Sequence, residues 1–121
     1  RGMRPLCLLA LLAACAVMLV PTASAASPTA TAAKACSVGD SRSYGTTYVL
    51  KISVRGTSCR SGKRLIRAFH DCRPGKSGRC SRVRRYSCSE SRFARISTQY
   101  SSRVTCRRGD RVVKHTYQQF T

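Results

Sequence analysis

Cysteine spacing constrains the fold of this chain more than any other feature. Two of its eight cysteines, Cys7 and Cys15, lie in an apolar N-terminal run. The other six are Cys36, Cys59, Cys72, Cys80, Cys88 and Cys106. An even number of cysteines in a short exported chain is typical of a disulfide framework. We therefore expect three disulfide bonds.

The pairing of these cysteines is predicted only in part. Cys72 and Cys80 flank a short loop rich in proline and glycine, so we expect them to bond to each other. Cys59 should open the buried face of a helix, and Cys88 and Cys106 should point inward from strands. We expect Cys59 to bond to Cys88 or Cys106, and Cys36 to bond to the other.

Zinc binding is the alternative use of these cysteines. Their spacings of 23, 13, 8, 8 and 18 residues contain no C-x₂₋₄-C pair, and neither histidine stands near one. We expect no metal and no other cofactor.

Residues 1–25 have the pattern of a secretory signal peptide. A basic start with Arg1 and Arg4 precedes the apolar run LCLLALLAACAVMLV, and Ala23–Ala25 form a small-x-small cleavage site. About 15 apolar residues fall short of the roughly 20 that a membrane span needs. We expect a secreted protein that begins near Ala26.

A lipid anchor is a competing interpretation of the same segment. Leu12–Cys15 resembles the lipobox of bacterial lipoproteins, with Cys15 as the acylated residue. The apolar run continues past this cysteine to Val20, which favours the signal peptide.

The charge of the chain favours an anionic partner. After the predicted signal, 21 basic residues, 16 of them arginine, face four acids, a formal charge of +17. Arginine suits bidentate contact with phosphate and carboxylate groups. Candidate partners are a cell-wall polymer, a phospholipid headgroup or a nucleic acid. The competing interpretation is a solvated surface that reflects genomic base composition.

The segment 48–72 predicts a strand that leads into a helix. Tyr48, Leu50, Ile52 and Val54 alternate with more polar residues, which indicates a strand with these four facing inward. Gly56 ends the strand. Thr57 or Ser58 is expected to cap the helix that follows. The apolar helix face is formed by Cys59, Gly62, Leu65, Ile66, Phe69 and Cys72. The opposite face is basic and is formed by Arg60, Lys63, Arg64 and Arg67.

The rest of the chain predicts more strands. Residues 83–90 alternate, and residues 103–107 and 111–120 form a hairpin signal joined at Arg108–Asp110. Residues 89–101 show no clear pattern and are expected to be an irregular connection. Residues 26–45 are expected to be a flexible leader and an N-terminal loop. Residues 46–121 then form a small disulfide-rich α+β domain, one helix packed on an antiparallel sheet of three to four strands in the order β-α-β-β-β.

Several of these pieces together resemble a family of small secreted, cysteine-containing proteins of high-GC Gram-positive bacteria whose function is uncharacterised. The matching positions span roughly residues 50–118 and comprise Val54-x-Gly56-x-Ser58-Cys59, the helix that ends near Phe69, Tyr86-x-Cys88, Val104-x-Cys106, Gly109 and Val113 to Tyr117. The chain departs from the family at Gly62, where alanine is usual, and at Arg85, where glycine is usual. Cys36, Cys72 and Cys80 are additions. The resemblance implies export and a helix-on-sheet fold, and no activity.

Two classes of function follow. The first is a secreted, non-catalytic binding or structural module that binds anionic polymers or surfaces. Its predicted anion-binding residues are Arg60, Lys63, Arg64 and Arg67, because like charges crowded on a helix are relieved by an anion. The second is a secreted ribonuclease-like enzyme or toxin that uses His70 and His115 as general acid and base. We favour the first, because the pattern around His115 places it inward on a strand, where a packed structural histidine is expected.

Overall fold

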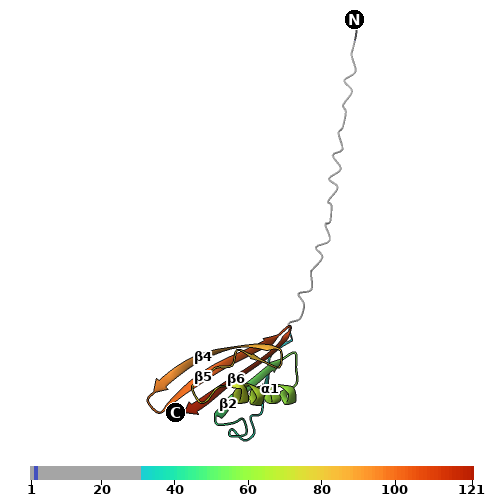
Figure 1. The fold of residues 1–121 in the computed structure, drawn as a ribbon. Coiled ribbons are helices and arrows are strands. Elements are labelled where there is room, and N and C mark those ends of the chain that lie inside the picture. The colour runs from blue at the N-terminus through green and yellow to red at the C-terminus, as the bar shows by residue number, and fades with distance from the viewer. Residues whose placement is uncertain (1, 3–30) are drawn as a thin grey trace.

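The computed structural model describes Gly2 and residues 31–121, so the predicted signal peptide, apart from Gly2, and Cys15 lie outside the described residues. The strands are β1 (Lys34–Cys36), β2 (Tyr48–Arg55), β3 (Arg82–Val83), β4 (Tyr86–Ile96), β5 (Gln99–Arg108) and β6 (Arg111–Phe120). One helix, α1 (Cys59–Cys72), joins β2 to β3. All six strands form one antiparallel sheet in the order β1-β2-β6-β5-β4-β3. Figure 1 shows the sheet curling, with α1 beside β2 and β6.

The predicted fold class, a helix packed on a sheet of three to four strands, is wrong. The domain is mostly a curled six-stranded sheet with one short helix. Residues 34–36, predicted to be part of a flexible leader, form β1 and pair with Ile52–Val54 of β2. Residues 89–101, predicted to be irregular, form most of the free end of the long β4–β5 hairpin.

The free end of the β4–β5 hairpin was not predicted because the residues that face inward there are polar. Glu90 of β4 accepts hydrogen bonds from Arg92 of the same strand and from Ser102 of β5, and the guanidinium group of Arg92 lies over the ring of Tyr100 on β5. A strand whose buried face is polar lacks the apolar alternation by which a strand is recognised.

A bulge in β2 changes which residues face the core. The register of β2 against β6 shifts between Val49 and Lys51, so Leu50 is an extra residue on one strand. Val49 is fully buried and Leu50 is 55% exposed, the reverse of the predicted pattern. Ile52 and Val54 face the core as predicted.

Helix α1 begins at a side-chain cap. The hydroxyl of Ser58, one of the two predicted caps, accepts a hydrogen bond from the backbone N–H of Ser61. Its buried face is formed by Gly62, Leu65, Ile66, Phe69 and His70. A Cβ atom at Gly62 would lie 2.6 Å from Cγ1 of Val54. Gly62 therefore allows the helix to lie directly on β2.

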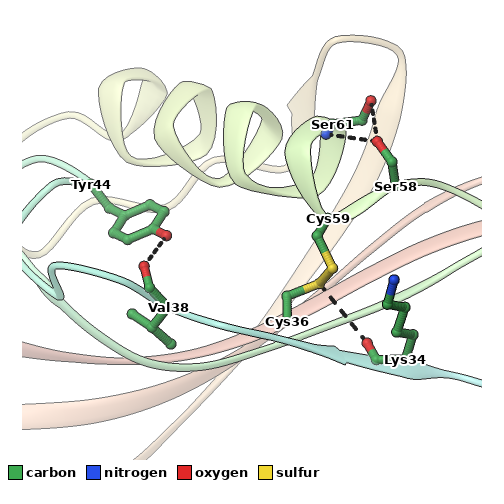
Figure 2. The surroundings of a disulfide bond; sticks show 7 residues. All are labelled: Lys34, Cys36, Val38, Tyr44, Ser58, Cys59 and Ser61. Atoms are coloured by element: carbon green, nitrogen blue, oxygen red, sulfur yellow. Dashed lines mark hydrogen bonds between the residues drawn. A yellow bond between two sulfur atoms is a disulfide. The ribbon is translucent and has the colours of Figure 1, made fainter.

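The three disulfide bonds pair neighbours in the fold. Cys72 bonds to Cys80, as predicted. The other predicted pairing is wrong: Cys36 bonds to Cys59, and Cys88 bonds to Cys106. Cys88 and Cys106 lie directly opposite each other where β4 pairs with β5. The sequence did not indicate this pairing, because residues 89–101 between them show no clear strand pattern. Figure 2 shows that the Cys36–Cys59 bond ties the end of β1 to the first residue of α1.

Removal of the Cys36–Cys59 bond should release β1. The bond closes a 23-residue separation, so replacing both cysteines by alanine should lower the free energy of unfolding by about 3 kcal/mol. Amide hydrogen exchange should accelerate in β1 and in the part of β2 that pairs with it. In the matched variant without Cys88 and Cys106, exchange in β1 should be unchanged. Non-reducing peptide mapping that joined Cys36 to Cys88 or Cys106 would contradict the pairing.

Alanine at position 62 should destabilise the domain although alanine favours helices. Overpacking against Val54 costs about 1–3 kcal/mol, more than the roughly 1 kcal/mol gained in helix propensity. The thermal midpoint of Gly62→Ala should fall by several degrees. In a Val54→Ala background the same substitution should be neutral or stabilising, because the obstructing methyl group is gone. An equal loss in both backgrounds would show that close packing on Val54 is not the cause.

Candidate anion-binding surface

The structure brings the two histidines of the chain together inside the domain. His70 comes from the last turn of α1 and His115 from the middle of β6, and their Nε2 atoms are 3.0 Å apart. The exposed fractions of the residues are 9% and 3%. Phe69 and Tyr117 pack their rings against the pair.

The hydrogen-bond partners determine the protonation of both rings. Nη1 of Arg73 lies 3.1 Å from Nδ1 of His70, and a guanidinium group only donates, so Nδ1 of His70 accepts. His70 therefore carries its proton on Nε2 and donates to Nε2 of His115. The proton of His115 is then on Nδ1, a buried atom with no hydrogen-bond partner among the described residues.

Both histidines are held neutral. Burial, followed by the charge of Arg73, lowers the pKa of His70 to about 3. Burial, followed by the nearby His70 and Arg73, lowers the pKa of His115 well below its usual value. A second proton on His115 would have to sit on Nε2, facing the N–H that His70 donates, and a second proton on His70 would sit on Nδ1, facing the N–H that Arg73 donates.

Arg73 is the centre of this buried network, and sequence reasoning did not single it out. Its guanidinium group donates to the backbone oxygens of Lys76 and Gly78, to the hydroxyl of Tyr100 and to Oε1 of Gln119. Arg73 directly follows α1, and only 7% of it is exposed. No apolar or charge pattern could have predicted the burial, because its partners come from separate parts of the chain.

Glu90 is the carboxylate of the same interior. Burial alone would raise the pKa of Glu90, but hydrogen bonds from Tyr117, Arg92 and Ser102 outweigh burial and hold the pKa below its usual value. Arg92 and Glu90 form the ion pair found among the described residues. Oε1 of Glu90 thus accepts three internal hydrogen bonds, whereas Oε2 is buried with no hydrogen-bond partner among the described residues.

This geometry does not suit acid–base catalysis by the two histidines. A general acid and a general base must each reach the substrate. Here each imidazole faces the other, both are buried, and both are held neutral. The pair can stabilise the interior, and it leaves no position for a phosphate between the two rings.

The predicted anion-binding face of α1 is divided by the fold. Arg67 donates from Nε to the backbone oxygen of Ser43 and lies over the ring of Tyr44, so it supports the 41–47 loop. The hydroxyl of Tyr44 in turn donates to the backbone oxygen of Val38 (Figure 2). Arg64 lines a separate hollow near the β5–β6 turn, whereas Arg60 and Lys63 do not line it. Anion binding by this helix face stays a prediction.

A second basic surface lies on the sheet face that points away from α1. Lys114 on β6 is directly opposite Ser53 on β2 and Thr105 on β5. Thr116, two residues further along β6, is opposite Lys51 and Arg103, and Val112 is opposite Arg55 and Arg107. We call the five cations the basic sheet face: Lys51, Arg55, Arg103, Arg107 and Lys114.

The register places Lys114 at the centre of the basic sheet face. The other four cations occupy its diagonal positions, where Cβ atoms are about 7–8 Å apart. None of the four carboxylates of the chain lies on this face: Glu90 points inward from β4, and Asp40, Asp71 and Asp110 lie outside the strands. Each of the four cations therefore lies within about one Debye length of Lys114.

Two shallow hollows flank Lys114 on this face. One, of about 280 Å³, is lined by Lys51, Arg103 and Lys114 together with the hydroxyl residues Ser53, Thr105 and Thr116. The other, of about 120 Å³, adds Arg55 and Arg107. Cations and hydroxyl groups together form a donor surface that suits anionic oxygens.

Sequence reasoning missed this surface although its residues carry a signal. Each of the three strands places cations and hydroxyls at alternate positions, as in Lys51-x-Ser53-x-Arg55. Alternation assigns them to one face of each strand. Only the order β2-β6-β5 reveals that the three faces adjoin.

The described residues hold neither a cluster of metal-ligating side chains nor a helix that could span a membrane. Across residues 31–121, no three histidine, cysteine, aspartate or glutamate side chains lie together as a metal site would require. The helix of this part, α1, is neither long nor apolar enough to cross a bilayer.

Acidification should destabilise the domain through the histidine pair. Both folded pKa values are lowered, so the unfolded chain binds protons first, and stability present above pH 6.5 is lost as the pH falls towards the folded values. The loss should approach about 1.4 kcal/mol per pH unit for each ring that stays neutral. Urea unfolding between pH 7.5 and 5 measures it.

The control for this pH dependence is the double variant His70→Phe/His115→Phe. Phenylalanine keeps an aromatic ring in place and cannot titrate, so the slope between pH 6.5 and 5 should flatten. A wild-type stability that does not change over this range would contradict the assignment of two neutral rings.

No protein-family model, curated protein or solved structure matches the chain. The resemblance to small secreted proteins of high-GC Gram-positive bacteria is not tested by these comparisons and stays a prediction.

Proposed function

We propose that this chain is a secreted, non-catalytic, cationic module that binds anionic polymers through the basic sheet face. The observation that carries the proposal is the arrangement of four cations around Lys114 with no carboxylate among them. Like charges this close together repel one another and destabilise the compact state. A bound anionic polymer relieves that repulsion.

An extended ligand fits this face better than a small one. The cations span three neighbouring strands, and the two hollows share Ser53 and Lys114, so the donors continue along the strands. Phe93 lies under the guanidinium of Arg103 beside this face. The rings of Tyr48 and Phe120 pack edge to face further along β2 and β6, on the same side of the sheet. The five cations hold such a ligand through its charged backbone.

Secretion is part of the proposal. Three disulfide bonds are compatible with an extracellular setting, where such bonds persist. Anionic polymers available there include wall polymers and released nucleic acid. Duplex DNA serves as a reference polyanion because the salt dependence of its binding is well understood.

The ribonuclease-like alternative has one observation in its favour, the 3.0 Å approach of His70 and His115. Burial of both rings opposes it. RNA incubated with the protein should stay intact. Cleavage that disappears in His115→Phe, while the variant still folds, would overturn the non-catalytic proposal.

The basic sheet face should account for the salt dependence of DNA binding. Each phosphate contact contributes about −0.9 to the slope of log affinity against log salt. Lys51→Gln/Arg107→Gln/Lys114→Gln should therefore make the slope shallower by about 3. Fluorescence anisotropy of a labelled duplex between 50 and about 300 mM salt measures it.

The matched control removes the same charge from the predicted helix face. Arg60→Gln/Lys63→Gln/Arg67→Gln should leave the slope unchanged, and Arg64 is retained in both variants. If the helix variant loses the slope and the sheet variant keeps it, the binding surface is the helix face. Equal losses in both variants would mean that overall charge, and no particular surface, binds the polymer.

A further inference from the structure

Four arginines, from α1, the β3–β4 turn and the β5–β6 hairpin, surround a hollow of about 180 Å³ at one end of the domain. Arg64 comes from α1, Arg84 from the β3–β4 turn, and Arg108 and Arg111 from the ends of β5 and β6. Thr57, Ser61, Leu65 and Tyr86 complete the lining. We call this the arginine hollow.

Two backbone features assemble the arginine hollow. A Cβ atom at Gly56 would lie 2.8 Å from the backbone oxygen of Asp110, so glycine lets the β5–β6 turn lie against the connection between β2 and α1. This contact brings Arg108 and Arg111 beside Arg64. On the other side, Arg84 and Arg85 join β3 to β4 with φ angles of 48° and 65°. Such two-residue turns favour asparagine and glycine, so arginine is an unfavourable choice there.

The charge of the arginine hollow is not balanced from within. No carboxylate lines it, and the ion pair between described residues, Arg92 with Glu90, lies elsewhere. Asp110 belongs to the adjoining turn, and its side chain is not part of the lining. Four guanidinium groups around so small a volume repel one another strongly unless an anion lies between them.

The chemistry of the lining selects the ligand. Guanidinium groups bind phosphate oxygens through pairs of parallel hydrogen bonds, and the hydroxyls of Thr57 and Ser61 add two further donors. A hollow of about 180 Å³ suits a compact group. We propose that the arginine hollow binds a compact, multiply charged phosphate group, either free pyrophosphate or the terminal phosphate of a longer molecule.

This site is independent of the basic sheet face. The two share no residue, and the basic sheet face offers cations spread along three strands whereas the arginine hollow gathers them around one point. An experiment can therefore refute one of the two proposed binding sites without refuting the other.

Calorimetric titration of the disulfide-bonded full chain with inorganic pyrophosphate tests the proposal. Arg108→Gln/Arg111→Gln should weaken binding at least tenfold. Arg82→Gln/Arg85→Gln removes the same charge from exposed residues of the β3–β4 hairpin that do not line the hollow, and it should change affinity less than twofold. Lys51→Gln/Arg107→Gln/Lys114→Gln should also leave pyrophosphate binding unchanged.

A charge-conserving pair separates a built site from a diffuse positive field. Arg108→Lys/Arg111→Lys keeps both charges and removes the bidentate donors, so pyrophosphate affinity should still fall severalfold. The proposal would be overturned if Arg108→Lys/Arg111→Lys bound pyrophosphate as tightly as the wild type, or if Arg82→Gln/Arg85→Gln lost as much affinity as Arg108→Gln/Arg111→Gln. It would also be overturned if the wild-type protein neither bound pyrophosphate nor preferred a ligand with a terminal phosphate.

Competition distinguishes the two sources of phosphate. If a 5′-phosphorylated oligonucleotide displaces pyrophosphate and its 5′-hydroxyl counterpart does not, the hollow binds the terminal phosphate of a polymer. If neither displaces pyrophosphate, the hollow binds the free anion. Both results require that the wild-type protein binds pyrophosphate and that Arg108→Gln/Arg111→Gln binds it at least tenfold more weakly.

Discussion

The buried guanidinium group of Arg73 is the interaction on which the interior depends. It joins the end of α1 to the 76–78 loop, to Tyr100 on β5 and to Gln119 on β6, and it fixes the orientation of His70. A buried charge is tolerated only when its hydrogen bonds are satisfied, and every one of these partners is an acceptor. His70 accepts only while it is neutral, so the network also requires that both histidines stay unprotonated. The packing of α1 against the sheet, the path of the following loop and the neutral histidine pair are thus parts of one arrangement.

The interior uses few of the basic residues of the chain, and the way in which the others are distributed suggests function. Arg73 and Arg92 are satisfied inside, and Arg67 supports the 41–47 loop. Many others gather where the described structure offers no carboxylate, on the basic sheet face and in the arginine hollow. The crowding of like charges costs stability, which three disulfide bonds help to offset in a small domain. A fold held together in this way can keep unbalanced charge available for a partner.

The two proposed sites differ in shape and therefore in the anion that each would bind. The basic sheet face is shallow and continues across β2, β6 and β5, which suits contacts with successive charges of a polymer. The arginine hollow is compact and draws its donors from α1 and two turns, which suits a single group of high charge. The histidine pair, in contrast, is directed inward and contributes to stability.

The sequence by itself determined the elements whose signals are local: a cap at Thr57 or Ser58, most of the buried face of α1, the Cys72–Cys80 bond and the inward direction of His115. Apolar periodicity, capping chemistry and loop length all act between residues that are close in the chain. Tertiary structure decided the six-stranded sheet, the two other disulfide pairs, the burial of Arg73 and the approach of His70 to His115. It also decided the candidate sites, because the basic sheet face exists only where β2, β6 and β5 adjoin and the arginine hollow only where two turns meet α1. These features depend on contacts between distant segments, and the polar inward residues of β4 and β5 concealed the pairing from any apolar pattern.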